Sequence, residues 1–310
     1  MLSIEKVRKS YGDKTVLDDI SFNVAAGETV ALLGANGSGK TTTINSICQL
    51  IEFEQGDILF NNTSIRTDRR YLKKVGAVLG GSRNINWRLT ACQNAEYFAA
   101  LRGHSGKQLK QHISALEARL GLKQYHTLEV LKLSTGNKQK AALLSALAYS
   151  PNLLLLDEPT LGLDIDTVEE LKNIIHQQST LNGQAFLVTS HDMSFIDKIC
   201  QKVVVLEQGK VIFNGDIASL KKALYSFKLE VKVPTQLIDN IQQKVEQLCM
   251  GRFQQHTRAT NLYIEFESPQ QVLGLLAWLN EQDIAPEHLT IMPLTMHDAF
   301  QTLMQRSKKA

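Results

Sequence analysis

The eight residues from Gly34 to Thr41 constrain the fold of this chain more than any other stretch. They read Gly-Ala-Asn-Gly-Ser-Gly-Lys-Thr and fit the pattern G-x-x-x-x-G-K-[ST]. An apolar run from Thr29 to Leu33 comes before them and is typical of a buried strand, while residues 41–47 favour a helix. In this strand–loop–helix context glycines let successive backbone N–H groups surround an anion. The stretch therefore predicts a phosphate-binding loop and a nucleotide site.

Two side chains at the end of this loop carry its polar chemistry. Lys40 is expected to reach the β- and γ-phosphates, and the Thr41 hydroxyl to join the shell of a Mg²⁺ ion. The helix N-terminus behind them adds its positive dipole end. Upstream, Tyr11 ends the first predicted strand and offers a ring that can stack on an adenine face. A chance match to a glycine-rich turn is the alternative, and the flanking strand and helix argue against it.

Composition bounds the remaining possibilities. The chain has 310 residues, enough for two domains, and its net charge of +3 comes from scattered basic residues that do not favour nucleic acid. It opens on a strand pattern rather than a signal-peptide core, and no apolar run reaches the ~18 residues of a membrane span. The cysteines form no C-x-x-C pair, so neither a disulfide framework nor a zinc site is expected. A soluble, cytoplasmic protein with four reduced cysteines is predicted, at Cys48, Cys92, Cys200 and Cys249.

A helical stretch interrupts the strands that follow the loop. Residues 75–80 favour one more short buried strand, but residues 90–149 lose the strand signals and carry helical periodicity. This change indicates a helical insertion in an α/β core. The insertion ends at Leu133-Ser134-Thr135-Gly136-Asn137, and Ser134 is a good N-cap for the helix that follows. Ser134 and the Gly136 backbone then either bind an anion at that helix N-terminus or form an ordinary cap.

Four consecutive leucines at 153–156 predict a strand that is buried on both faces of a parallel sheet. Asp157 and Glu158 follow at its carboxyl end, where ligands bind in open α/β sheets. Asp157 is suited to hold Mg²⁺ through water, and Glu158 to orient and polarise the attacking water. His191 follows the next buried strand, at 185–190, and is interpreted as a γ-phosphate contact.

In this order and spacing, the motifs resemble the ATPase subunit of ATP-binding cassette (ABC) transporters over about residues 1–222. The fold that this implies is an α/β phosphate-loop NTPase core with a helical subdomain at about 83–150. Asp164 fits the D-loop of the family. The implied catalytic residues are Glu158, His191 and Lys40; the implied metal ligands are Thr41 and Asp157; and the implied nucleotide-binding residues are Tyr11, Gly34, Asn36, Gly37, Ser38, Gly39, Lys40, Thr41, Thr42, Ser134, Gly136 and Asp164.

The resemblance also implies a mechanism and partners. Two subunits pair head to tail, most simply as a homodimer, and each Mg²⁺-bound ATP lies between one phosphate loop and the other subunit's signature at 133–137. Hydrolysis or product release lets the subunits part and drives a membrane partner. Residues 83–90, with Asn94 and Tyr97-Phe98, resemble the type-2 export branch, in which the permease is a separate chain. The expected location is the cytoplasmic face of the inner membrane, without a nucleic-acid partner.

Two departures from the family pattern concern the metal shell and the signature. In the family a glutamine follows the strand at 75–79, whereas Gly81 stands there in this chain; Gln93 is an alternative source of the amide. The signature reads Leu-Ser-Thr-Gly-Asn where the common form is Leu-Ser-Gly-Gly-Gln. Ser134 and Gly136, whose hydroxyl and N–H would face phosphate, are retained.

The sequence is also compatible with two other functions. One is an ABC ATPase that acts on ribosomes or DNA rather than on transport, but a single cassette without a long heptad run favours transport. The other is a catalytically weak regulatory subunit, which the two departures suggest. The presence of Lys40, Glu158 and His191 argues against that reading.

Beyond Lys222 the pattern restarts and predicts a second domain at 223–310. No catalytic cluster is found in it, and a regulatory or dimer-supporting role is left open. The order of its periodic segments predicts a small β-α-β-β-α-β, ferredoxin-like α+β unit, followed by a terminal helix. The expected segments are strands at 227–233, 262–266 and 289–291, and helices at 237–248, 269–279 and from Thr295.

Overall fold

The chain forms two compact units, Met1–Asp216 and Ile217–Ala310. In the computed structural model the described residues are 1–80, 85–224, 227–232, 240–241, 243, 253–255, 261–266, 269–281, 288–292 and 295–307. Helix α7 (Ile217–Leu224) belongs to the second unit, where it packs against α10 (Met296–Ser307). The boundary between 222 and 223 stays a prediction.

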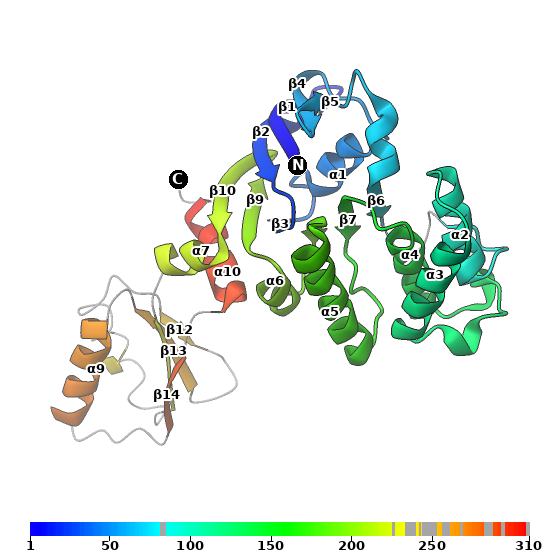
Figure 1. Cartoon of the computed structure of the whole chain (residues 1–310). Helices are drawn as coiled ribbons and strands as arrows, with labels where there is room; N and C mark the ends of the chain where they lie inside the picture. The colour runs from blue at the N-terminus through cyan, green and yellow to red at the C-terminus, as the bar shows by residue number, and fades with distance from the viewer. Residues whose placement is uncertain are drawn as a thin grey trace. The chain divides into compact units, whose positions relative to one another are not determined.

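An antiparallel sheet begins the first unit (Figure 1). Strands β1 (Leu2–Tyr11) and β2 (Lys14–Val24) form a hairpin whose turn is Gly12 and Asp13, and Gly12 has a φ of +56°. The pairing of the two strands continues to the turn, with Tyr11 opposite Lys14. The strand order is β2-β1-β4-β5, with β4 at Gln55–Phe60 and β5 at Thr63–Ser64.

A six-stranded sheet carries the predicted phosphate loop. Its order is β10-β9-β3-β8-β7-β6, in which β10 pairs antiparallel with β9 and the other neighbours are parallel. Strands β3, β7 and β8 are buried at every residue, as continuous apolar runs predict for strands covered on both faces. The strands are β3 (Thr29–Gly34), β6 (Val75–Val78), β7 (Leu153–Asp157), β8 (Ala185–Thr189), β9 (Lys202–Glu207) and β10 (Lys210–Asp216).

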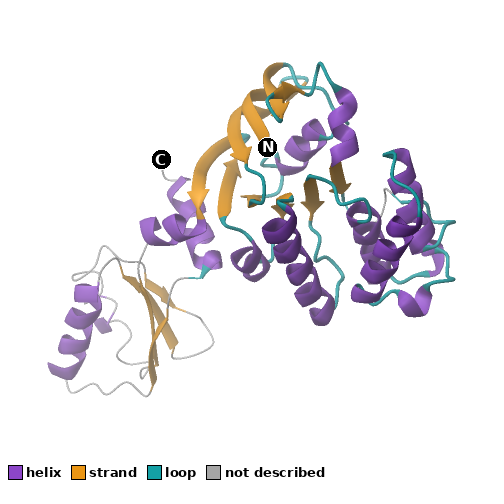
Figure 2. Ribbon diagram, in the orientation of Figure 1, coloured by secondary structure: helices purple, strands orange, loops and turns teal. Residues whose placement is uncertain are grey.

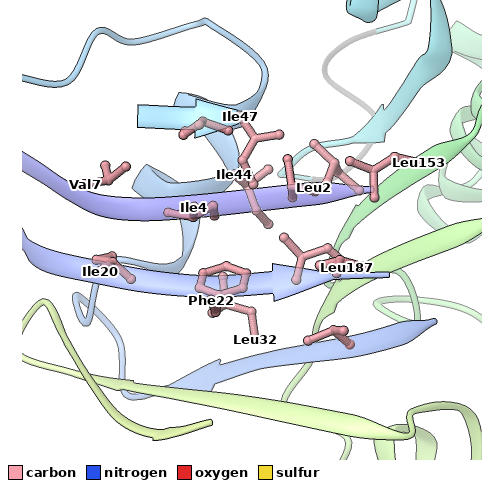
Figure 3. Packing of buried hydrophobic residues seen from close by; sticks show 14 of the residues in the cluster. Leu2, Ile4, Val7, Ile20, Phe22, Leu32, Ile44, Ile47, Leu153 and Leu187 are labelled. Carbon is pink, nitrogen blue, oxygen red and sulfur yellow. The ribbon is translucent and has the colours of Figure 1, made fainter. Parts of the chain in front are cut away.

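Helix α1 (Lys40–Ile47) joins the two sheets into one core. It packs against β2 of the antiparallel sheet and against β3 and β7 of the parallel sheet. Figure 3 shows its Ile44 and Ile47 among side chains from both sheets, including Leu2 and Leu153. The burial of these side chains fixes the start of α1, and with it the phosphate loop, relative to the carboxyl ends of the parallel strands.

Helices α5 (Ile165–Asn182) and α6 (Met193–Ile199) pack against each other, and α5 also packs on β8. In Figure 1 they lie on the side of the parallel sheet away from α1. Both ends of helix α5 are capped. Asp164 accepts a hydrogen bond from the Thr167 N–H at one end, and Gly183 takes the left-handed conformation at the other.

Three helices occupy the stretch for which the sequence predicts a helical insertion. They are α2 (Ala91–Leu101), α3 (Lys107–Arg119) and α4 (Thr135–Leu147). In Figure 2 they form the group of purple helices on the right. Helix α4 packs on α2, on α3 and on β6, so it connects the helical region to the parallel sheet. This unit also contains 3₁₀ turns at Arg69–Lys74, Lys123–Tyr125 and Val130–Lys132.

The second unit contains a four-stranded antiparallel sheet of order β12-β13-β11-β14. Helix α9 (Pro269–Glu281) packs on β13 and buries Val272, Leu275 and Leu279. The helix predicted at 237–248 falls mostly outside the described residues, so the ferredoxin-like assignment stays a prediction. The strands are β11 (Phe227–Lys232), β12 (Phe253–Gln255), β13 (Asn261–Phe266) and β14 (His288–Met292).

The structure also bears on the cysteines and on membrane-spanning helices. Cys48, Cys92 and Cys200 are free thiols, and Cys249 lies outside the described residues. Within the described ranges, no helix combines the length and the apolar character needed to cross a bilayer.

Candidate nucleotide site

The loop between β3 and α1 has a backbone that only glycine adopts easily. Gly34, Gly37 and Gly39 have φ values of 153°, 79° and 110°. A Cβ on Gly34 would also run into the Leu206 carbonyl oxygen and the Ser38 side chain. The curvature and the close packing of the loop therefore both depend on these residue types, as the sequence pattern predicts.

The polar groups of this loop suit a phosphate. No described side chain caps α1, so the N–H groups of its first turn are available to an anion. Ser38 Oγ is buried and has no hydrogen-bond partner among the described residues. Lys40 Nζ donates to the carbonyl oxygens of Gly34 and Ala35, at 2.8 and 3.1 Å. Unused donors and a cation in a glycine cradle fit the phosphates of a nucleotide.

Lys40 lies in an environment that opposes its charge. Burial lowers the pKa of its ammonium group, and the nearby carboxylates of Glu158 and Asp157 act in the opposite direction. A bound phosphate would add a further anion next to this amine. Phosphate binding and full protonation of Lys40 therefore favour each other.

Asp157 and Glu158 lie at the carboxyl end of β7, and Thr189 at the end of β8 holds both. The buried Asp157 accepts a hydrogen bond from Thr189 Oγ1 at 2.5 Å. The Glu158 N–H donates to the Thr189 carbonyl oxygen at 3.1 Å. Sequence reasoning missed Thr189, because a threonine at the end of a buried apolar strand is common and its position opposite Asp157 comes from the pairing of β7 with β8.

Glu158 has an unusual backbone conformation. Its φ is +51°, in the left-handed region that side-chain-bearing residues rarely adopt. Such conformations cost free energy and are concentrated at functional sites. In this conformation the Glu158 side chain contacts His191. The His191 N–H donates to Glu158 Oε2 at 3.2 Å, and His191 Nε2 lies 3.6 Å from Glu158 Oε1. The strained residue and the histidine thus face each other.

One cavity of about 230 Å³ collects most of the predicted site residues. The residues meet because the carboxyl ends of parallel strands lie along one edge of a sheet. Val16 of β2 lines the cavity and was not predicted, since nothing in the alternation of β2 distinguishes it. Tyr11 does not line the cavity; its side chain is exposed and Lys9 Nζ lies 5.0 Å from its ring. The lining residues are Val16, Asn36, Gly37, Gly39, Lys40, Thr41, Thr42, Asp157, Glu158 and His191.

Helix α4, which has Ser134 and Gly136 at its start, packs against the segment that ends at Asp164. Ser134 Oγ accepts a hydrogen bond from the Asn137 N–H at 3.3 Å and so caps the helix. Gly136 packs so closely on the Gly162 carbonyl oxygen that any side chain there would collide with it. Gly162 belongs to the segment that ends at Asp164, so the signature and the D-loop form one packed unit within the chain.

Two positions bear on the missing amide, Gly81 and Gln93, and the structure describes only Gln93. Gly81 lies outside the described residues. Gln93 forms a capping box with Thr90: its Oε1 accepts from the Thr90 N–H at 2.9 Å, and its own N–H donates to Thr90 Oγ1 at 3.3 Å. It does not line the cavity at the phosphate loop. The side chain of Gln93 is therefore engaged at the start of α2.

Comparisons with known proteins agree with this geometry. The ABC transporter family model matches residues 17–161. The ABC transporter ATP-binding protein NatA of Bacillus subtilis is 31% identical over 78% of this chain and 100% of NatA. The Nod factor export ATP-binding protein I of Paraburkholderia xenovorans is 32% identical over 71% of this chain and 72% of its own. The methionine import ATP-binding protein MetN of Clostridioides difficile is 30% identical over 70% of this chain and 68% of MetN.

Solved structures share the fold of about 70% of this chain. An ATP-binding subunit of an ABC transporter superposes with a TM-score of 0.68 at 27% identity, over 72% of this chain and 92% of that one. A dimeric ATP-binding cassette in a post-hydrolysis state, bound to ADP and Pi, gives a TM-score of 0.64 at 25% identity. The match covers 70% of this chain and 98% of that one. By sequence and by fold, this chain belongs to the ATP-binding subunits of ABC transporters, which are ATPases.

Proposed function

We propose that this chain is the Mg²⁺-dependent ATPase subunit that powers export through a separate membrane permease. The observation that carries the proposal is the cavity in which the loop lysine, two carboxylates and His191 meet. A cation for the phosphates, oxygen ligands for a metal and a base for water are the parts that phosphoryl transfer to water needs.

Binding of ATP would redirect Lys40 and use the free N–H groups of α1. Lys40 Nζ would exchange the carbonyl oxygens of Gly34 and Ala35 for phosphate oxygens. A bound Mg²⁺ neutralises charge on the phosphates, and it prefers oxygen ligands, which Thr41 Oγ1 and, through water, the Asp157 carboxylate can supply. The hydrogen bond from Thr189 holds the Asp157 carboxylate in one orientation.

Glu158 is the residue that would polarise the attacking water and receive its proton. Its carboxylate is 28% exposed, so it reaches the cavity but keeps part of its hydration shell. The His191 N–H fixes Oε2 and leaves Oε1 directed toward the imidazole. His191 would then contact the γ-phosphate beside Glu158, which orders the acceptor carboxylate and the phosphate relative to each other.

We further propose that two copies of the chain pair head to tail. Ser134 and Gly136 do not line the cavity of their own chain, which leaves them for the ATP of a second subunit. Next to Asp164, Leu161 and Ile165 are apolar side chains with exposed fractions of 66% and 81%, as expected of a surface that a second copy covers. The related cassette bound to ADP and Pi is a dimer, which supports this arrangement.

Export is the direction that we favour for the transporter. The Nod factor export relative supports it, and the methionine import relative makes import the alternative. We assign the permease contact to the helical region, where Trp87, Tyr97 and Leu101 are apolar and exposed. The subunit would then work at the cytoplasmic face of the inner membrane, without nucleic acid. The cassette would comprise about residues 1–222, including a helical subdomain at about 83–150, and residues 223–310 an accessory domain.

The proposal is tested first by ATP hydrolysis and then by transport. Lys40→Ala removes the cation at the β- and γ-phosphates and is expected to abolish Mg²⁺-dependent hydrolysis, while Lys107→Ala, at the exposed start of α3, is expected to hydrolyse ATP normally. Wild-type turnover in Lys40→Ala would refute the site. Co-purification with a permease, followed by ATP-driven uptake into inside-out vesicles, supports export; ATP-driven release from them supports import.

A further inference from the structure

We propose that Cys92, Glu117 and His126 form a zinc site in the helical region, separate from the nucleotide site. One donor atom from each residue lies within 4.8 Å of the other two. The residues come from different elements: Cys92 is in α2, Glu117 is in α3, and His126 follows the 3₁₀ turn Lys123–Tyr125. None of the three lines the cavity at the phosphate loop.

The three side chains converge on one point. His126 Nδ1 lies 2.7 Å from Glu117 Oε1 and 3.8 Å from Cys92 Sγ. A sulfur, a ring nitrogen and a carboxylate oxygen from three different elements therefore lie close together, and hydrogen bonds join them.

Burial makes this cluster unusual for a region of surface helices. Glu117 is only 3% exposed, and a buried carboxylate requires compensation by charge or hydrogen bonds. The described residues provide no lysine or arginine as an ion-pair partner for Glu117, and His126 is charged only when protonated. A divalent cation would balance both this carboxylate and a Cys92 thiolate, which gives a neutral cluster.

The donor types select the metal. Sulfur, imidazole nitrogen and carboxylate oxygen together suit Zn²⁺, whereas Mg²⁺ and Ca²⁺ favour oxygen ligands alone. Zinc bonds of about 2.0 Å to nitrogen and about 2.3 Å to sulfur place the donors of a tetrahedral site about 3.3–3.6 Å apart. The distance from Sγ to Nδ1 is already near that value, and the distance from Nδ1 to Oε1 widens when the hydrogen bond is replaced by the ion. Water would occupy the fourth position.

Binding requires that two protons leave the donor atoms. The thiol proton passes to the solvent, and in a neutral imidazole the ring proton moves from Nδ1 to Nε2. The His126 side chain is 61% exposed, so water can solvate the new N–H and the ion can reach the cluster from the surface. No oxidation or reduction takes part.

The ion would fasten the segment before the signature to the start of α2. That segment is already bound there, because the Val130 N–H donates to the Leu89 carbonyl oxygen at 2.9 Å and the Leu131 N–H to that of Trp87 at 2.8 Å. His126 lies just before these contacts and Cys92 just after Leu89 in the chain. Zinc would therefore stiffen the part of the helical region that leads to Ser134. The inference does not depend on the direction of transport.

The test is zinc binding to the metal-free full-length chain in excess Mg²⁺ and without nucleotide. We expect one Zn²⁺ per chain by calorimetry and elemental analysis, a rise in melting temperature, and, with Co²⁺ as the probe, a thiolate charge-transfer band. Cys92→Ser should lose the band and the rise in melting temperature. His126→Ala should bind no zinc at concentrations that saturate the wild type. His126 is exposed, so its replacement should leave the apo protein folded, which circular dichroism checks.

Matched variants separate this site from other thiols and carboxylates. Cys200→Ala removes a buried cysteine elsewhere, and Asp157→Asn alters the carboxylate of the nucleotide site; both should keep one Zn²⁺ per chain and the cobalt band. Absence of zinc binding by the wild type would overturn the proposal. Binding that survives the double change Cys92→Ser and His126→Ala, or that is lost in Cys200→Ala or Asp157→Asn, would overturn it as well.

Discussion

Lys140 Nζ lies 2.8 Å from Asp164 Oδ2, and this ion pair joins the signature helix α4 to the start of α5. The Asp164 side chain is 58% exposed, so water weakens the attraction. The other carboxylate oxygen, Oδ1, accepts hydrogen bonds from the N–H and the Oγ1 of Thr167, at 2.8 and 2.7 Å. One side chain thus caps α5 and also holds the two helices together.

This double role predicts a graded loss of stability. Asp164→Ala removes both the cap and the ion pair and should lower the free energy of unfolding by about 1 kcal/mol or more, the usual cost of a lost N-cap. Asp164→Asn keeps a capping oxygen and loses only the charge, so it should cost less. Urea unfolding of both variants, with Asp166→Ala as the control in the same helical turn, checks this order. Equal losses for Asn and Ala would contradict the capping role.

The same carboxylate predicts a dependence on pH. Hydrogen bonding to Lys140 and then to Thr167 lowers the pKa of Asp164 below its ordinary value. A folded pKa below the unfolded one contributes stability above the unfolded pKa, about 3.9, and this contribution disappears as pH falls toward the folded pKa. The difference in stability between wild type and Asp164→Asn should thus stay constant from about pH 7 to 5 and shrink below about pH 4. A difference that grows on acidification would show that the sign is wrong.

Glu158→Gln should bind ATP but hydrolyse it very slowly. The amide keeps the shape of the side chain and loses the basic oxygen that polarises water. If two chains pair around ATP, the trapped nucleotide should hold them together, and size-exclusion chromatography with Mg²⁺ and ATP should show a dimer. A persistent monomer that hydrolyses ATP normally would count against both the base and the pairing.

Thr189 should support catalysis through the two carboxylates rather than through contact with ATP. Thr189→Val keeps the volume of this buried side chain and removes the hydroxyl that holds Asp157. We expect turnover to fall by about tenfold, or about 1.4 kcal/mol, with a smaller change in ATP affinity. Thr189→Ser, which retains the hydroxyl, should recover most of the turnover. Equal losses in Val and Ser would point to packing instead.

Gly81→Gln tests the departure from the family at the metal shell. Mg²⁺ keeps several waters, so the added amide should leave ATP binding nearly unchanged and affect hydrolysis or its stimulation by the permease. Gln93→Ala is the paired variant. Because Gln93 takes part in the capping box of α2, its loss should lower stability without changing the Mg²⁺ requirement. A large rise in the Mg²⁺ needed for hydrolysis by Gln93→Ala would show that Gln93 is the ligand.

Local signals in the chain were enough to predict the phosphate loop and the strands around it. The glycines at 34, 37 and 39 encode a backbone shape, and the four leucines before Asp157 encode a strand buried on both faces. Both depend on neighbours in the chain, so spacing alone carries the information. The end of β7 predicts where Asp157 and Glu158 lie for the same reason.

Contacts between distant segments could not be predicted in this way. Thr189 becomes a partner of Asp157 only because β8 pairs with β7, and Gly136 has a packing role only because α4 approaches Gly162. Their residue types are common at strand ends and helix starts, so neither carries a distinctive local pattern.

The cysteines show most clearly the difference between what local sequence patterns predict and what tertiary contacts decide. Their spacing alone argued against zinc, because metal sites are recognised in sequence by ligands close together in the chain. Cys92 and His126 are 34 positions apart, and α3 brings Glu117 to the same point. The sequence by itself determined the fold family and the nucleotide loop, which depend on short-range patterns. Tertiary packing alone decided which distant side chains meet, because helix packing, and not chain spacing, sets the distance between their donor atoms.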